Sequence, residues 1–169
     1  MKNFTLSLFF VLISGFVYGQ CPTTNIVLST QSDVDNFADN YPNCTALTHE
    51  LKIDGSINSI TNLNGLSQII STQKLFIFNT DIVDLSDLDN LEDAVHLAIW
   101  GNQNMQDLTG LNSLQSIGFM EVFVNSNLTS LNGMPNLSSL DNISIFQNTS
   151  LNDITQLSFV ETLTNVEIW

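Results

Sequence analysis

The sequence contains no arginine and only three lysines, which face seventeen acidic residues and give a net charge of −14. Contacts with phosphates need a basic surface, so this shortage of basic side chains excludes a nucleic-acid partner. The same balance argues against docking on an anionic membrane surface. Hydrophobic residues make up 43% of the 169 positions. That share excludes a disordered acidic tail and is enough for one domain with a single core.

Sequence motifs for catalysis are also missing. The pair His49-Glu50 begins a string typical of zinc proteases, but Ile53 stands where the second histidine is required. The chain has no G-x-S-x-G nucleophile motif and no glycine-rich loop for phosphate. We therefore expect a protein that is not an enzyme and that uses no cofactor and no metal.

The first nineteen residues predict a signal peptide. Lys2 supplies the positive start, residues 4–17 are mostly apolar, and Gly19 is preceded by compact residues suited to cleavage. The apolar stretch is too short for a stable membrane span, and no other apolar run approaches that length. We expect cleavage near Gly19 and a protein that is secreted or held at the cell surface.

The two cysteines, Cys21 and Cys44, have two competing uses. Export permits a disulfide between them, and closing a loop of this length contributes roughly 3 kcal/mol in the chain-entropy model. Their spacing excludes a C-x-x-C metal site. The alternative is lipid attachment at Cys21, although Gln20 occupies the position where lipoprotein signals carry a small residue.

An internal repeat is the main signal in the chain. After about residue 57, apolar residues recur every third position, with one two-residue step in each copy. One copy runs Met105, Leu108, Leu111, Leu114, Ile117, Met120, Val122, Asn125, Leu128. A three-residue step drifts around an α-helix, which turns about 100° per residue, but suits extended or short 3₁₀ backbone. The two-residue step is strand spacing. Each copy therefore predicts one coil with a short strand, and consecutive strands lie parallel and side by side.

Two sets of matched positions predict structural roles. Asparagines stand three residues after the second strand residue, where a buried amide can bond backbone groups freed as the strand turns away. These are Asn102, Asn125 and Asn148. Glycines at matched positions are expected in turns that need positive φ. These are Gly65, Gly110 and Gly133.

The pattern L-x-x-L-x-L-x-x-N, as in residues 117–125 and 140–148, resembles the leucine-rich repeat signature. The front end has Cys21, an extended segment at 26–28, an expected helix over 32–40, Cys44 and a strand at 51–55. This order resembles the amino-terminal cap of receptor L-domains, and many exported bacterial surface proteins carry similar domains.

The resemblance covers essentially all of residues 21–169. It implies a right-handed solenoid with one parallel sheet, about 22–24 residues per repeat, and a cap closed by a Cys21–Cys44 disulfide. The chain would then divide into a signal peptide at 1–19, a cap with a short helix at 20–50, and repeats at 51–169.

The residue after each strand pair is aromatic in five consecutive copies: Phe78, Trp100, Phe123, Phe146 and Trp169. Strand alternation should send these side chains outward, in a row along the sheet. Exposed aromatic rows favour sugar rings, peptides or partner proteins. The alternative is that the rings stack on one another and only stabilise the sheet. The neighbouring outward position is mixed: Lys52, Phe76, Ala98, Glu121, Ser144 and Glu167.

Acidic residues gather in one coil: Asp81, Asp84, Asp87, Asp89, Glu92 and Asp93. A calcium site needs several oxygens converging on one point, and no D-x-D-x-D-G loop is present. We expect a solvated outer face, with an adventitious cation as the alternative.

The last copy stops at Trp169, inside a strand, which would leave an apolar coil face without a cover. We expect either a fragment or contact with further repeats or another chain there. The composition, motifs and resemblance together predict a non-enzymatic extracellular binding or adhesion module for a protein, peptide or glycan. The alternatives are a structural spacer that displays another domain, and an accessory domain of a secreted hydrolase.

Overall fold

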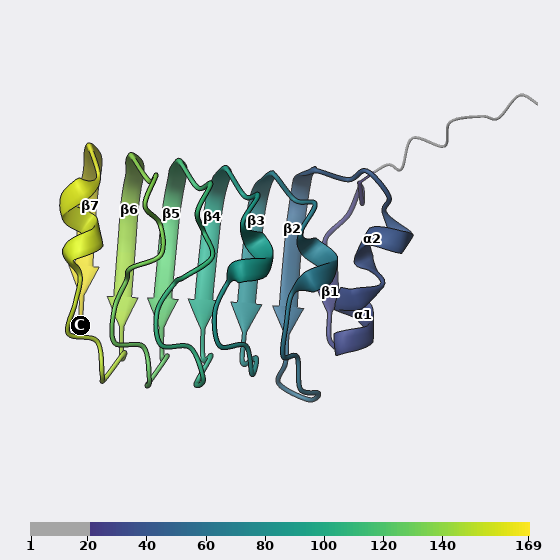
Figure 1. The fold of residues 1–169 in the computed structure, drawn as a ribbon, viewed down its shortest axis with the longest axis horizontal. Helices are drawn as coiled ribbons and strands as arrows, with labels where there is room; N and C mark the ends of the chain where they lie inside the picture. Colours follow the sequence, from purple (N-terminus) through teal and green to yellow (C-terminus); the bar gives the residue numbers. More distant parts are fainter. Residues whose placement is uncertain (1–20) are drawn as a thin grey trace, which may run out of the picture.

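The computed structural model describes residues 21–169, so the predicted signal peptide lies outside the described residues. The chain forms one sheet of seven parallel strands that pair in sequence order. Figure 1 shows these strands side by side. They are β1 (Ile26–Leu28), β2 (Ala46–Asp54), β3 (Ser71–Phe78), β4 (Asp93–Trp100), β5 (Ser116–Phe123), β6 (Ser139–Phe146) and β7 (Thr162–Ile168). The predicted parallel, solenoid-like architecture is confirmed.

Equivalent positions of successive copies are paired across the sheet. Leu75 lies beside Leu97, Leu97 beside Met120, and Met120 beside Ile143. Between strands, the chain returns through turns and three short 3₁₀ helices, as the three-residue step predicts. These are η1 (Asn64–Leu66), η2 (Ser86–Leu88) and η3 (Thr155–Phe159). The two-residue step therefore marks each strand, and the three-residue steps mark the return path.

The core runs along the inside of the stacked coils. Leu85, Leu108 and Leu131, at the same position of successive coils, are fully buried. Each such side chain contributes roughly 1.5–3 kcal/mol on full burial, so stability depends on neighbouring coils. In the final coil, the matching Ile154 is 40% exposed, because in the described chain this coil has a neighbour on one side only.

The amino-terminal end is covered by two short helices, α1 (Gln31–Asp35) and α2 (Phe37–Asn40) (Figure 1). The predicted disulfide between Cys21 and Cys44 is present. The expected single helix over 32–40 is wrong, because the helix breaks at Asn36. The Asn36 side-chain amide donates to the Ser32 carbonyl, and such local bonds compete with a continuous helix.

Two of the three matched glycines lie in the left-handed region, with φ of 115° at Gly110 and 129° at Gly133. The expectation for Gly65 is wrong, since its φ is not positive. Gly65 lies in η1, where a Cβ would overlap the carbonyl oxygen of Val34. The close approach of α1 to the first return path thus explains this glycine.

A membrane-spanning helix would need about 20 apolar residues. None of the helices within residues 21–169 is long and apolar enough to cross a membrane.

Candidate functional site

The aromatic row lies on the outward face of the sheet, at the carboxyl ends of the strands. Sheet register places Phe78 beside Trp100, Trp100 beside Phe123, and Phe123 beside Phe146. Trp169 follows β7 and continues the row, because its backbone N–H donates to the carbonyl of Ile145 on β6.

Neighbouring rings in this row pack edge to face. The ring centroids are 5.5 Å apart for Phe78 and Trp100, 5.8 Å for Trp100 and Phe123, and 6.1 Å for Phe123 and Phe146. The interplanar angles are 73°, 78° and 79°. Such pairs add about 0.5–1.5 kcal/mol beyond the burial of their area. The row therefore stiffens the sheet as well as offering apolar surface.

Exposure within the row is uneven. Phe78 and Phe123 are half-buried, whereas Trp100 is 47%, Phe146 39% and Trp169 78% exposed. A ligand crossing the strands would therefore meet the indole of Trp100 and the rings of Phe146 and Trp169 first. The uncovered aromatic surface is concentrated over β4, β6 and the end of β7.

A second row of rings, which was not predicted from the sequence, lies beside the first. The imidazole of His96 lies between Phe76, at 4.8 Å between centroids, and Phe119, at 5.0 Å. Ala98 of β4 lies beside Phe76 of β3 and faces outward, yet it is only 3% exposed. The larger side chains around it therefore cover it from solvent.

The second row can be traced in the sequence to a three-residue step within each strand. A strand read as strictly alternating inward and outward residues misses this step. The three-residue step from Thr72 to Leu75 places two residues, Gln73 and Lys74, on the outward side between buried neighbours. The same step recurs in the next strands, and it carries His96 and Phe119 to the position of Lys74. Only the pairing of adjacent strands shows that they meet.

Charged groups flank the rings near β2. The ammonium of Lys52 lies 2.7 Å from a carboxylate oxygen of Asp54 and 5.1 Å from the centroid of the Phe78 ring. Hydrogen bonds from Lys52 and then from Ser56 lower the pKa of Asp54 to about 2. A further pair joins His96 Nε2 and a carboxylate oxygen of Glu121, at 2.7 Å.

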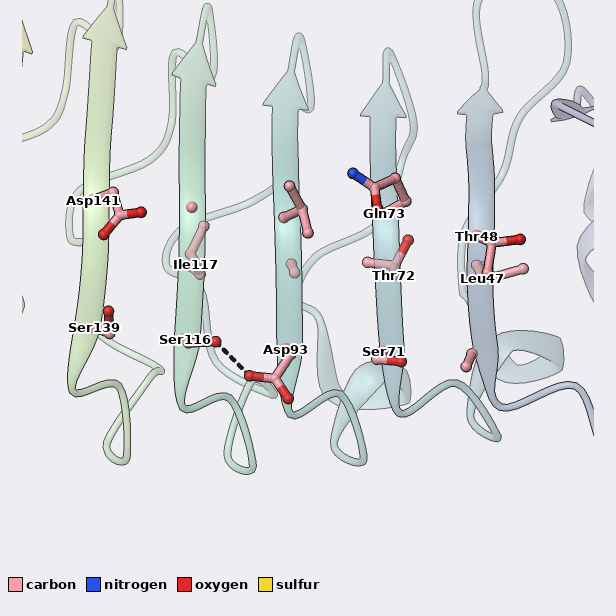
Figure 2. Close-up of a pocket in the computed structure, with 14 residues that line it drawn as sticks. Leu47, Thr48, Ser71, Thr72, Gln73, Asp93, Ser116, Ile117, Ser139 and Asp141 are labelled. Atoms are coloured by element: carbon pink, nitrogen blue, oxygen red, sulfur yellow. Dashed lines mark hydrogen bonds between the residues drawn. The ribbon is translucent and has the colours of Figure 1, made fainter.

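A groove of about 510 Å³ with a mixed polar and apolar lining crosses the opposite, amino-terminal ends of β2 to β6. Figure 2 shows its side chains on these neighbouring strands. One column contributes Ser71, Asp93, Ser116 and Ser139, and the other Thr48, Gln73, Val95, Gly118 and Asp141. Gly118 leaves part of the groove without a side chain, and Ser116 donates a hydrogen bond to Asp93. This groove was not predicted.

A smaller hollow of about 280 Å³ lies at the β7 end of the aromatic row. Its walls are the rings of Phe123, Phe146 and Trp169, with Ser144 and Glu167 supplying oxygens. All five of these side chains come from the two outward columns singled out in the sequence, and register brings them together across three strands.

The matched asparagines lie inside the solenoid, away from this face. Each side-chain oxygen accepts from a backbone N–H one coil earlier: Asn102 from Thr80 at 3.0 Å, Asn125 from Asn102 at 2.8 Å, and Asn148 from Asn125 at 2.9 Å. Each amide nitrogen donates to a strand carbonyl of the previous coil. Asn102 and Asn125 are fully buried and Asn148 half-buried. The ladder ties coils together.

The carboxylates of the acidic coil do not converge on one point; the bonds of Asp87 and Asp89 go to separate partners. Asp87 accepts from the backbone N–H of Leu63 at 2.6 Å, and Asp89 from the side-chain amide of Asn112 at 2.6 Å. Within residues 21–169, no group of three His, Cys, Asp or Glu side chains is arranged to hold a metal ion.

Comparison with protein-family models, with curated proteins and with solved structures gives no match for this chain.

Proposed function

We propose that this protein is an exported, non-enzymatic binding or adhesion module that takes a protein, peptide or glycan on the outward face of its sheet. We further propose that it belongs to the receptor L-domain-like leucine-rich repeats. The repeat signature, the parallel sheet in chain order and the cap disulfide Cys21–Cys44 support that relationship. Export is supported by the sequence of residues 1–19 and by the disulfide.

The observation that carries the binding proposal is the aromatic row across five coils, three of whose rings are exposed. Trp100, Phe146 and Trp169 expose large apolar surfaces to solvent. Their column is aromatic in all five copies, whereas the other outward columns are mixed or polar. Contiguous exposed apolar surface of this kind marks interaction sites. Rings held by their neighbours also lose little rotational freedom on binding, so more of the contact energy contributes to affinity.

A structural spacer is the second candidate, and the edge-to-face packing favours it. Contacts such as that between Trp100 and Phe123 stabilise the sheet without any ligand. A spacer and a binding module differ in one observable: a spacer has no ligand for its outward face.

Glycan and peptide arrays probed with the chain from residue 20 onward separate the two. Binding that disappears in the Trp100→Ala/Phe123→Ala double variant, with unchanged circular dichroism, supports the binding module. The matched control is Ile57→Ala/Val83→Ala, which removes two exposed apolar side chains outside the strands. Binding unchanged in the double aromatic variant removes the row from the account, and no binding to either array favours the spacer.

A further inference from the structure

The chain itself holds an ammonium group at one end of the aromatic row. Lys52 Nζ lies 5.1 Å from the centroid of the Phe78 ring and 2.7 Å from the Asp54 carboxylate. An aromatic face attracts a cation through its quadrupole, and the carboxylate supplies the opposite charge. At this end of the row, the cation beside the aromatic ring is therefore supplied by the protein's own Lys52.

The hollow at the other end offers the same groups without a cation. Phe123, Phe146 and Trp169 form its walls, and Glu167 lies among them. Within residues 21–169 the lysines are Lys52 and Lys74, on β2 and β3, whereas the hollow spans β5 to β7.

Glu167 has no ion pair in the described part of the chain. Its carboxylate accepts a hydrogen bond from the Ser144 hydroxyl at 3.4 Å. An unpaired carboxylate beside three rings is complementary to a cation that also has apolar surface. The excess of acidic residues, with a net charge of −14, attracts cations toward the molecule.

We propose that this hollow binds an organic ammonium group, with Phe123, Phe146 and Trp169 facing the cation and Glu167 as its counter-ion. The ligand group is the ammonium of a lysine side chain or a small quaternary ammonium ion, which share this chemistry. The proposal rests on the proposed function of the outward face and narrows its ligand from a protein, peptide or glycan in general to one that carries an organic ammonium group.

The test compares choline with 3,3-dimethylbutan-1-ol, which has the same shape but no charge. In a Trp100→Phe variant, Trp169 is the one remaining tryptophan, and its emission reports on the hollow. We expect choline to change this emission saturably, and the neutral alcohol to bind about tenfold more weakly or not at all. Equal binding of the two overturns the proposal.

Two variants test the named groups. Glu167→Gln and Phe146→Leu should each weaken choline binding by about threefold to tenfold. The matched control is Asp141→Asn, which removes a carboxylate from the groove at the amino-terminal ends of the strands, on the same sheet face. Unchanged binding in both Glu167→Gln and Phe146→Leu, or an equal loss in Asp141→Asn, contradicts the assignment.

A lysine-containing peptide, compared with choline, distinguishes the two sources of the cation. The same peptide acetylated at the lysine Nζ is its uncharged control. Tighter binding of the free-lysine peptide than of choline identifies a protein ligand, the reverse order identifies a small ammonium ion, and both support the site. Suppose that array ligands bind through the Trp100 and Phe123 rings while every ammonium probe fails. The ammonium proposal is then wrong and the proposed function stands, whereas failure of both assays rejects both.

Discussion

The side-chain oxygen of Asn125 accepts a hydrogen bond from the backbone N–H of Asn102, at 2.8 Å, and so joins two successive coils. The amide nitrogen of Asn125 donates to the carbonyl of Ile99 at 3.0 Å. All three residues are buried, so water cannot replace these bonds if the side chain is removed.

Replacing Asn125 by alanine should lower the free energy of unfolding by about 2–4 kcal/mol, because it leaves a buried N–H and a buried C=O without partners. Urea denaturation followed by circular dichroism measures the change. The control is Asn104→Ala, whose exposed amide bonds the Asp81 carbonyl at 3.3 Å and should cost less than about 0.5 kcal/mol. Equal losses of unfolding free energy in the two variants would show that the buried asparagine ladder stabilises the fold no more than an exposed amide does.

Thr72 carries a buried hydroxyl with no hydrogen-bond partner in the described structure. Thr72→Val removes this unsatisfied group at nearly constant shape and should raise the free energy of unfolding by about 1 kcal/mol. Thr80→Val is the matched control, since the Thr80 hydroxyl donates to the Asn102 oxygen at 2.6 Å. That change should instead lower stability by about 1 kcal/mol. Denaturation midpoints that move in the same direction for both variants contradict the prediction.

Val124, directly after Phe123 of the aromatic row, has a φ of 58°, which is unfavourable for a β-branched residue. Asn79, at the matching position two coils earlier, has a φ of 50° and belongs to a type that tolerates this region. Val124→Asn should therefore raise the melting temperature, by relieving about 1 kcal/mol of strain, and Asn79→Val should lower it. Differential scanning calorimetry gives both values, and a lower melting temperature for Val124→Asn contradicts the strain argument.

The pKa of Asp54, lowered to about 2 by Lys52 and then Ser56, makes stability depend on pH. A carboxyl group with a depressed pKa in the folded state stabilises it above the unfolded-state pKa of about 4. That contribution, at most about 2 kcal/mol, is lost as the pH falls through about 2.

The test compares wild type and Asp54→Asn across this range. The stability difference between them should be largest at pH 5–7 and should shrink between pH 4 and pH 2. The pKa of Asp33 is also lowered, chiefly by the Thr30 hydroxyl, so the wild-type curve alone does not isolate Asp54. A difference that stays constant from pH 6 to pH 2 contradicts the prediction.

The sequence predicts most of the fold because the repeat is local: every third residue faces one interior, and the two-residue step marks each strand. Parallel strands and the stacked apolar positions follow from this spacing, whereas the cap disulfide was expected from the predicted export and from the resemblance to receptor L-domains. The break at Asn36 and the role of Gly65 were missed, because each depends on a contact between particular groups rather than on the period.

The functional face was predicted in part for the same reason. The row from Phe78 to Trp169 repeats at a fixed position and is visible in the sequence. The contact between His96 and Phe119, and the groove that includes Gly118, depend on strand register at a point where strict alternation fails.

The central claim is that ligand binds against the rings of the outward face, and Trp100 reports on it most directly. In a Trp169→Phe variant Trp100 is the single tryptophan, and its indole is 47% exposed. We predict that a ligand found on the arrays covers the Trp100 indole and so lowers the constant for quenching of its fluorescence by acrylamide. A bound ligand that leaves Trp100 quenching unchanged would contradict the account.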